Sequence, residues 1–410
     1  MNRTVLYVVV LLVAANSAEC QLAGSSWPKA HADAGNSGYT PIVARAGEFQ
    51  WDSGARWIKG VSVGQNGAIY HCNSVGLTAT TSDGSLKWDW RLLGAGQGYP
   101  AIDKDGMIYF VSVRDRVGYL SALWPDGRRK WSVPLGQYQL GTESSPTIDS
   151  LGNILIGTMD QGVVYSFRAS SGQKLWSIET GYWIDTTMAI GPDNSVYFAN
   201  NNSEVVALTS DGKFKWKVDL GLGRNATGGV SVGSEGDVYC ANAAGFGIGP
   251  DVGVLARINS AGTVMWSVSS GPGSIQPPTI GPDGTIYLLG IDGVLRAFDS
   301  SSHLLWECAT GLDYGSALTV PVVDGAGVIY FVATDGLRSA SYLVGVGPDG
   351  KERVRMDMLG RDPGPIAIGP QGQIYTGYAS IVPEPGSLLT IATGVLGMAA
   401  VRRRASLHHA

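Results

Sequence analysis

One pattern of about forty residues recurs along most of this chain of 410 residues. Each copy holds a short apolar strand, a turn rich in glycine and aspartate, and a second strand around an aromatic residue. These turns suit tight hairpins, because Asn-Gly and Asp-Gly pairs accept positive φ. The second strand centres on a tyrosine in all copies but one: Tyr70, Tyr109, Leu155, Tyr197, Tyr239, Tyr287, Tyr330 and Tyr375. A spacing of roughly 40 to 48 residues is typical of a four-stranded propeller blade.

A tryptophan ends the second half of most copies. It follows a second turn and recurs at one repeat position: Trp88, Trp131, Trp176, Trp216, Trp266 and Trp306. A seventh copy carries Val354 at this place. Half of the twelve tryptophans therefore share one structural position. We expect their rings to be buried between neighbouring blades, each contributing about 2–3 kcal/mol, rather than to form a ligand platform.

The number of copies predicts a closed ring. Seven units are complete between Val61 and about Leu359, whereas the eighth, residues 366–378, shows only its first two strands. A stray outer-strand pattern ends at Trp51, before the first unit, and can complete the last blade, so that no sheet edge stays open. We therefore predict an all-β, eight-bladed propeller of four-stranded blades, whose last blade is closed by the N-terminal strand. Seven blades is the alternative if the weak seventh unit does not pair.

The composition agrees with a turn-rich β protein and argues against a nucleic-acid partner. The chain holds 58 glycines and 44% hydrophobic residues, enough for a large core. Only 15% of its residues are charged, and the net charge is −5. We interpret Cys72, Cys240 and Cys308 as buried and mostly unpaired, with a single disulfide left open as the alternative.

The N-terminus predicts secretion. Arg3 precedes an apolar run from Val5 to Ala15, and small and polar residues follow up to Ala18. This charged, apolar and small order is that of a signal peptide, which we place at residues 1–18. A lipoprotein anchored at Cys20 is the alternative, but Glu19 fits a lipobox poorly.

The C-terminus carries a second sequence pattern typical of protein sorting. Pro383, Glu384 and Pro385 precede an apolar stretch at residues 388–401, and Arg402, Arg403 and Arg404 follow. We expect the stretch to form a short apolar helix, marginal for crossing a bilayer, with the arginines on the cytoplasmic side. The segment resembles the PEP-CTERM sorting signal of Gram-negative-type bacteria. That resemblance implies a transient membrane anchor, processing by an exosortase-type enzyme, and then a cell-surface or extracellular location, often alongside exopolysaccharide export. An ordinary tail anchor is the alternative.

The body of the chain resembles the PQQ-repeat, or quinoprotein-like, propellers. The likeness covers residues 27–378 and includes the opening segment with Trp27, Pro28, His31, Asp33 and Gly38. The predicted division is a signal peptide at 1–18, a propeller at 25–380 and a sorting segment with its transmembrane helix at 381–410. These motifs are specific for the fold and weak for function, because a fold does not determine an activity.

Enzymatic members of that family are quinone-dependent dehydrogenases. The resemblance implies that they hold pyrroloquinoline quinone on the propeller axis, against a tryptophan, with Ca²⁺ bound by Glu, Asn and Asp, an Asp as base and often a vicinal disulfide. This chain has no adjacent Cys-Cys pair and lacks most of the long insertions that build such a site. His31, His71 and His303 are far apart, so a three-histidine metal site is not expected. We predict no catalytic, cofactor-binding or metal-binding residues.

A small binding site would lie at one mouth of the channel, on the loops before the inner strands. The candidate residues there are Tyr99, Glu143, Trp183, Asp185, Arg224, Gln276, Tyr314 and Arg361. Their mixture of aromatic, acidic, amide and basic groups suits sugars or peptides. The leading hypothesis is a displayed, non-enzymatic binding or scaffold propeller whose partner is an envelope polysaccharide or a secreted protein. The alternatives are a PQQ-dependent dehydrogenase of alcohols or sugars, and a propeller that assists outer-membrane protein assembly.

Overall fold

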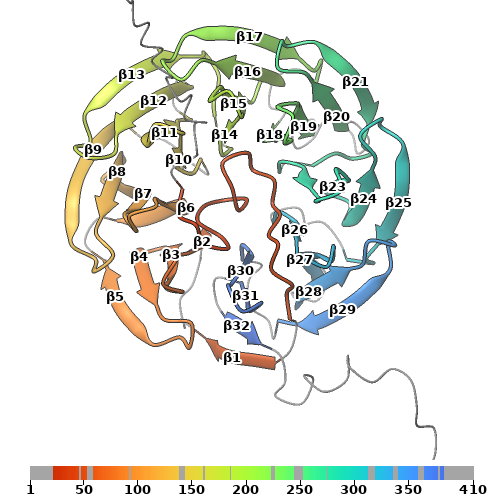
Figure 1. The fold of residues 1–410 in the computed structure, drawn as a ribbon, viewed down its shortest axis with the longest axis horizontal. Helices are drawn as coiled ribbons and strands as arrows, with labels where there is room; N and C mark the ends of the chain where they lie inside the picture. Colours follow the sequence, from red (N-terminus) through yellow and green to blue (C-terminus); the bar gives the residue numbers. More distant parts are fainter. Residues whose placement is uncertain are drawn as a thin grey trace, which may run out of the picture.

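The described residues of this chain form a ring of antiparallel sheets around a central axis (Figure 1). The computed structural model describes residues 22–45, 48–52, 59–91, 94–137, 144–159, 162–184, 186–222, 227–243, 253–274, 276–312, 319–335, 340–358, 364–376 and 379–382. The strands in these ranges form eight four-stranded sheets. In seven sheets the four strands are consecutive in the chain, and we number these blades 1 to 7. The eighth sheet joins both ends of the chain, and we name it the closing blade.

The bounds of the strands follow the repeat units, from the inner to the outer strand of each blade. Blade 1 holds β2 (Gly60–Val63), β3 (Ile69–Asn73), β4 (Gly76–Thr80) and β5 (Leu86–Trp90), and blade 2 holds β6 (Ala95–Ile102), β7 (Ile108–Arg114), β8 (Val117–Leu123) and β9 (Arg129–Gln137). Blade 3 holds β10 (Thr147–Ile148), β11 (Asn153–Gly157), β12 (Val163–Arg168) and β13 (Lys174–Glu179), and blade 4 holds β14 (Ala189–Ile190), β15 (Val196–Ala199), β16 (Glu204–Leu208) and β17 (Phe214–Asp219). Blade 5 holds β18 (Thr227–Val232), β19 (Val238–Ala243), β20 (Gly253–Ile258) and β21 (Val264–Ser269), and blade 6 holds β22 (Thr279–Ile280), β23 (Ile286–Leu289), β24 (Val294–Phe298) and β25 (Leu304–Ala309). Blade 7 holds β26 (Val322–Val323), β27 (Ile329–Asp335), β28 (Ala340–Val346) and β29 (Glu352–Asp357), and the closing blade holds β30 (Ala367–Ile368), β31 (Ile374–Tyr375), β32 (Ala379–Val382) and β1 (Glu48–Asp52).

The closing blade corrects the predicted fold in one detail. We expected the last repeat to supply only two strands, but it supplies three, and β1 adds the fourth on the outside. Strand β32 pairs with both β31 and β1. Its four residues contain no Asp-Gly turn and no tryptophan, so the repeat pattern does not mark them. Blade 7 pairs in full although Val354 replaces the tryptophan. Seven blades consist of consecutive strands, and the closing blade is the additional sheet that combines β1 with the last three strands.

The predicted C-terminal helix needs correction as well. The described residues form strands, turns and bends, and none of them forms a helix. Within these ranges no helix is long and apolar enough to cross a membrane. The stretch for which we expected the helix, residues 388–401, lies outside the described residues, as does the predicted signal peptide at 1–18.

The repeated tryptophans join neighbouring blades, as their common position predicts. Each indole N–H donates to a backbone carbonyl in an outer turn of the next blade, as Trp176 does to Ser210 O at 3.0 Å and Trp216 to Ser260 O at 2.9 Å. A glycine in that turn lets the ring approach. An ideal Cβ on Gly212 would lie 2.5 Å from the Trp176 ring, and Gly212 has φ +81°.

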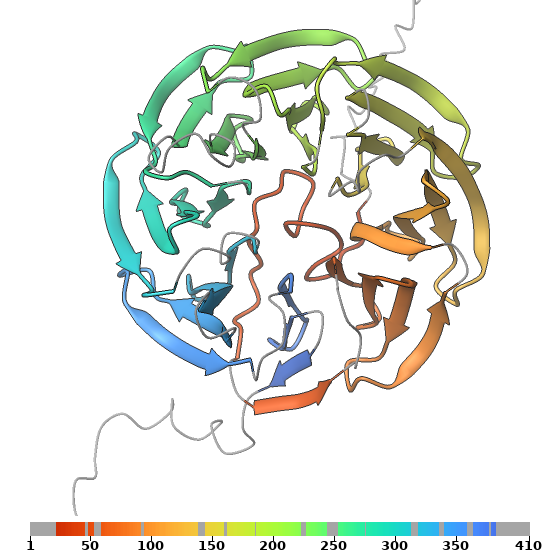
Figure 2. The ribbon, with the colours of Figure 1, turned by 180° about the vertical axis from the view of Figure 1, so that it is seen from behind.

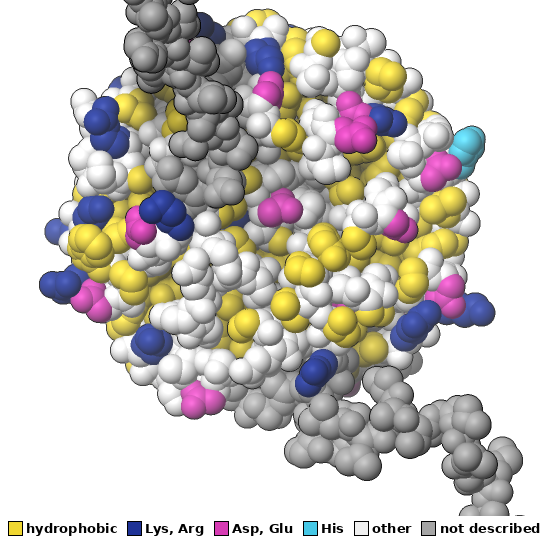
Figure 3. All heavy atoms as spheres, viewed as in Figure 1, with side chains coloured by type: hydrophobic (Ala, Val, Ile, Leu, Met, Phe, Trp, Pro, Cys, Tyr) yellow, Lys and Arg dark blue, Asp and Glu magenta, His cyan; other side chains and the backbone are white. Residues whose placement is uncertain are grey.

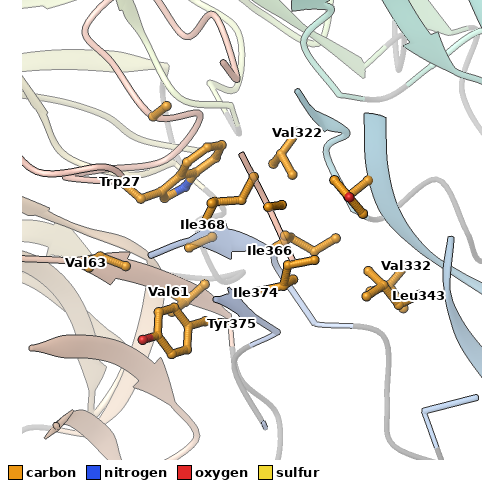
Figure 4. Close-up of a cluster of buried hydrophobic side chains, with 14 of the residues drawn as sticks. Trp27, Val61, Val63, Val322, Val332, Leu343, Ile366, Ile368, Ile374 and Tyr375 are labelled. Atoms are coloured by element: carbon orange, nitrogen blue, oxygen red, sulfur yellow. The ribbon is translucent and has the colours of Figure 1, made fainter. Parts of the chain in front are cut away.

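The joint between blade 1 and the closing blade is sealed by the N-terminal residues. Trp27, 1% exposed, belongs to the same apolar cluster as Val61 and Val63 of β2, Ile368 of β30 and Tyr375 of β31 (Figure 4). The first described residues therefore stabilise the place where the ring closes.

Candidate functional site

Residues 22–45, which we name the axial segment, run across the centre of the ring (Figures 1 and 2). Its backbone carbonyls accept hydrogen bonds from the N–H groups at equivalent ends of inner strands. The described bonds are Val63 to Trp27 (2.7 Å), Ile102 to Pro28 (2.9 Å), Ile190 to Ala34 (2.7 Å), Val232 to Gly35 (2.7 Å), Ile280 to Ser37 (2.7 Å) and Val323 to Gly38 (2.9 Å). Six blades thus hold one segment through backbone groups that would otherwise need another partner.

A buried hydrogen-bond cluster around Lys29 and Asn36, which we name the polar knot, fixes the middle of the axial segment. The ammonium group of Lys29, whose side chain is fully buried, donates to Ala30 O at 2.8 Å, to Asp33 O at 3.0 Å and to Asn36 Oδ1 at 2.5 Å. Asn36 Nδ2 donates in turn to Thr187 O and Val230 O, each at 3.1 Å. Because burying a charge requires several strong hydrogen bonds, the knot defines one conformation of the segment against blades 4 and 5.

His31 lies next to this knot, inside the channel. Its side chain is 5% exposed, its φ is 58°, and its ring centroid is 6.1 Å from that of Tyr99. Burial, and secondarily the positive charge of Lys29, lowers the pKa of His31 to about 3. The imidazole is therefore neutral at physiological pH, in the role of a packed core residue.

A quinone on the channel axis, which the likeness to quinone dehydrogenases implies, does not fit the described channel residues. Lys29, Ala30 and His31 belong to the axial segment, which crosses the centre of the ring (Figure 1), and each is at most 5% exposed. No group of three or more His, Cys, Asp or Glu side chains that could hold a metal ion occurs within the described ranges. Cys72 and Cys240, which are free and buried, lie on strands of different blades. Within the described residues, the vicinal disulfide that the likeness implies therefore has no counterpart.

The described cysteines behave as packed side chains. Cys72, Cys240 and Cys308 are free, as expected. Burial raises the pKa of Cys72 and raises that of Cys240 to about 12. These two thiols therefore stay protonated and unreactive at neutral pH.

A hollow of about 690 Å³ lies beside the axial segment, and we name it the axial hollow. It is bounded by residues 33–39, by the inner turns of blades 3, 4, 5 and 6, and by outer residues of blades 5 and 6. Its charged lining residues are Asp33, Glu235, Asp237, Asp283 and Arg257. Four carboxylates thus face a single guanidinium, which favours neutral or cationic partners.

Among the charged residues that line the axial hollow, Arg257 and Asp237 form an ion pair, whereas Glu235 and Asp283 are exposed. Arg257 donates from Nε to Asp237 Oδ2 at 2.8 Å and from Nη1 to Ser300 O at 2.9 Å. The carboxylates of Glu235 and Asp283 are exposed to solvent, and Asp283 accepts only a local bond from Thr285 N–H at 3.0 Å among the described hydrogen bonds. These two carboxylates are accessible to a bound molecule.

The predicted rim residues are only partly described. Tyr99 is half-buried, and its ring lies beside that of His31. Trp183 is 39% exposed, and its backbone N–H donates to Asn201 Oδ1 at 3.1 Å. Gln276 is half-buried, and its backbone N–H donates to Ser274 Oγ at 3.2 Å. The remaining candidates lie outside the described residues: Glu143, Asp185, Arg224, Tyr314 and Arg361. The same holds for the sorting residues Pro383, Glu384, Pro385, Arg402, Arg403 and Arg404.

Sequence reasoning missed the axial hollow. Its carboxylates stand in turns of the repeat, where aspartate has a sufficient local explanation. The available signal was the resemblance of the opening segment to the family, because that segment forms one wall of the hollow.

Two family models match this chain. The PQQ-repeat model described as the outer membrane protein assembly factor BamB matches residues 40–183 and 160–251. These overlapping matches span residues 40–251, more than half of the 410 residues. The chain belongs to this PQQ-repeat family. The model of the PEP-CTERM protein-sorting motif matches residues 382–404, and no curated protein matches the sequence.

Solved structures share the fold of this PQQ-repeat propeller. BamB from Moraxella catarrhalis is 18% identical, with a TM-score of 0.62 over 84% of this chain and 98% of that one. The quinohemoprotein alcohol dehydrogenase of Comamonas testosteroni is 14% identical, with a TM-score of 0.66 over 86% of this chain and 77% of that one. A europium-containing methanol dehydrogenase is 12% identical, with a TM-score of 0.57 over 78% of this chain and 89% of that one. At these identities the likeness shows the fold alone.

The sorting motif adds a location to the fold. A PEP-CTERM motif implies processing by exosortase-type machinery, and it supports secretion and display at the cell surface. The combination therefore indicates a secreted surface protein built on a PQQ-repeat propeller.

Proposed function

We propose that this chain is a surface-displayed, non-enzymatic propeller that binds an envelope polysaccharide or a secreted protein. The observation that carries the proposal is the axial segment, which takes up the space where a quinone enzyme needs its cofactor. Its buried Lys29 and Asn36 and its bonds to six inner strands make it a fixed part of the fold. The fold then serves as a rigid support for surface binding.

The second candidate is a quinone-dependent dehydrogenase of alcohols or sugars. It is favoured by the fold likeness to quinohemoprotein alcohol dehydrogenases. The filled channel and the free, separate Cys72 and Cys240 count against it. The two candidates differ in whether the protein binds a quinone together with Ca²⁺.

The axial hollow is the place that we propose for the partner. Its exposed carboxylates would attract a neutral or cationic group, such as the amine of an amino sugar or a lysine side chain, and would repel an acidic polysaccharide. The wide face drawn in Figure 3 mixes acidic, basic and apolar side chains, with acidic groups scattered over it and most Lys and Arg side chains near the edge.

Binding of the mature protein to isolated cell envelopes tests this proposal. We expect the double variant Glu235→Gln with Asp283→Asn to bind about 5- to 30-fold more weakly, because two exposed charge contacts are worth about 1–2 kcal/mol together. The matched control is Asp105→Asn with Asp115→Asn, which removes two exposed carboxylates from blade 2. Equal loss in both double variants, or no binding of the unaltered protein to envelopes, would contradict the proposal.

A further inference from the structure

A further hollow of about 710 Å³ borders the axial segment, and we name it the second hollow. It is lined by parts of residues 22–28 and 32–42, and by Gly64, Gln65 and Pro370 in the inner turns of blade 1 and the closing blade. The axial hollow is bordered by the inner turns of blades 3 to 6 instead. The volumes of both hollows lie within the range of roughly 300–1,000 Å³ that is typical of ligand sites.

The two hollows share one wall. Asp33, Ala34, Gly35 and Tyr39 line both of them. Each hollow is also bordered by turns that join the two innermost strands of a blade, and these turns lie at one face of the ring. The hollows are therefore neighbours on that face, separated by residues 33–39.

The wall between the hollows is held in place by backbone bonds on both sides of Tyr39. Val323 N–H donates to Gly38 O at 2.9 Å, and Thr40 N–H donates to Val323 O at 3.0 Å. The Tyr39 side chain is half-buried and packs against the apolar cluster of blades 6 and 7. A fixed aromatic ring between two hollows offers a surface on which the apolar face of a sugar ring can pack.

The two hollows differ in charge. The axial hollow is lined by four carboxylates and one guanidinium, whereas Asp33 is the one charged residue among those that line the second hollow. Gln65 is exposed there and offers a neutral amide. A molecule that spans both hollows would thus place a cationic group in the axial hollow and neutral, hydrogen-bonding units in the second.

The bordering turns favour a sugar chain over an extended peptide. Extended peptides are commonly bound by strand addition to an open sheet edge. The turns instead use their N–H groups internally, as Gly64 does to Ala68 O at 2.8 Å and Gly233 to Asp237 O at 2.9 Å. These described turns therefore offer no open strand edge, whereas sugar hydroxyls can bond to single side chains such as Gln65.

We propose that the partner is a linear polysaccharide containing amino sugars, which lies across both hollows and over Tyr39. The inference rests on the proposed function, in which the axial hollow binds the partner, and adds the chemical class and the extent of that partner. Because one chain would occupy two linked sites, its affinity should rise steeply with chain length until both hollows are filled.

Calorimetric titration of the mature protein with β-1,4-linked glucosamine oligomers gives the first test. We expect an oligomer of about eight units to bind about 100-fold more tightly than the dimer, because the second hollow is reached only by the longer chain. The N-acetylated oligomer of the same length should bind about 3- to 10-fold more weakly, because it lacks the ammonium groups that face Glu235 and Asp283. A gain with length of less than about ten-fold, which the repeated units would give at a single site, would overturn the inference.

A variant that fills the second hollow gives the second test. Gln65→Trp places a large side chain in that hollow, whereas the matched control Gln173→Trp makes the same change at an exposed glutamine in an outer turn of blade 3. We expect Gln65→Trp to bind the long oligomer at least about ten-fold more weakly than the control does. Equal affinities of the two variants would overturn the inference.

Competition on cell envelopes separates this inference from the proposed function. We expect the long glucosamine oligomer to displace the mature protein from envelopes, and the dimer to displace it far less well. Envelope binding that no oligomer displaces would overturn the inference and indicate a secreted protein as the partner, with the proposed function still standing. A mature protein that does not bind to envelopes would refute the proposed function itself.

Discussion

At the scale of single residues, the propeller is held by buried polar groups that lie where its channel would otherwise be open. Lys29 and Asn36 join the axial segment to itself and to blades 4 and 5. His31 lies beside them and His71 lies within blade 1, and both are almost fully buried. These groups make the fold sensitive to acid as well as to substitution.

Acid should weaken the fold through the two buried histidines. Burial, and Lys29 second, lowers the folded-state pKa of His31 to about 3, and burial, partly offset by Asp89, lowers that of His71 to about 4. The unfolded chain takes up these protons near pH 6.5, so the stability is complete above that pH and falls as the pH drops toward the folded values. At pH 5 the loss is about 2 kcal/mol for each histidine.

Urea unfolding at pH 7.5 and pH 5 checks this expectation. The variant His31→Asn keeps a residue that accepts positive φ, and it should remove its share of the pH dependence. His303→Asn changes an exposed histidine and serves as the matched control. A free energy of unfolding that does not differ between the two pH values would contradict the neutral, buried state of both rings.

At the scale of elements, much of the ring was predictable, because each blade repeats one arrangement of turns and aromatic residues. The tyrosine strands and the outer tryptophans identify seven blades of consecutive strands, and Trp51 correctly places β1 in the closing blade. Strand β32 was not predicted, since its pairing depends on two distant strands and its own sequence has no turn. The path of the axial segment was not predicted either, because its bonds to the inner strands use backbone carbonyls that any residue carries. The axial hollow depends on that path.

The contact between blades can be measured with two glycines of equal backbone conformation. Gly212 has φ +81° and its Cβ position lies 2.5 Å from the Trp176 ring, whereas Gly284 has φ +82° and no atom within 4 Å of that position. We expect Gly284→Ala to cost about 1 kcal/mol from backbone strain, and Gly212→Ala to cost a further 1–3 kcal/mol or so from crowding of the ring. Equal midpoints of thermal unfolding for the two variants would contradict the packing of the tryptophan on the neighbouring turn.

At the scale of the whole molecule, the first and the last described strands, β1 and β32, pair within one blade. Residues before β1 cross the channel, β1 closes the ring, and β32 leads into the sorting motif. In this arrangement the axial segment crosses the centre of the ring, and the two wide faces of the propeller remain exposed to solvent. We therefore propose that binding occurs on the surface, as in the axial hollow, and that the centre of the ring holds no quinone.

Titration of the mature protein with pyrroloquinoline quinone and Ca²⁺ tests that claim most directly. Tryptophan fluorescence reports binding, and dye-linked oxidation of a panel of alcohols and sugars reports turnover. We predict neither a saturable fluorescence change nor dye reduction, because the axial segment takes up the cofactor's place. Saturable quinone binding with turnover would contradict the account and identify the propeller as a dehydrogenase.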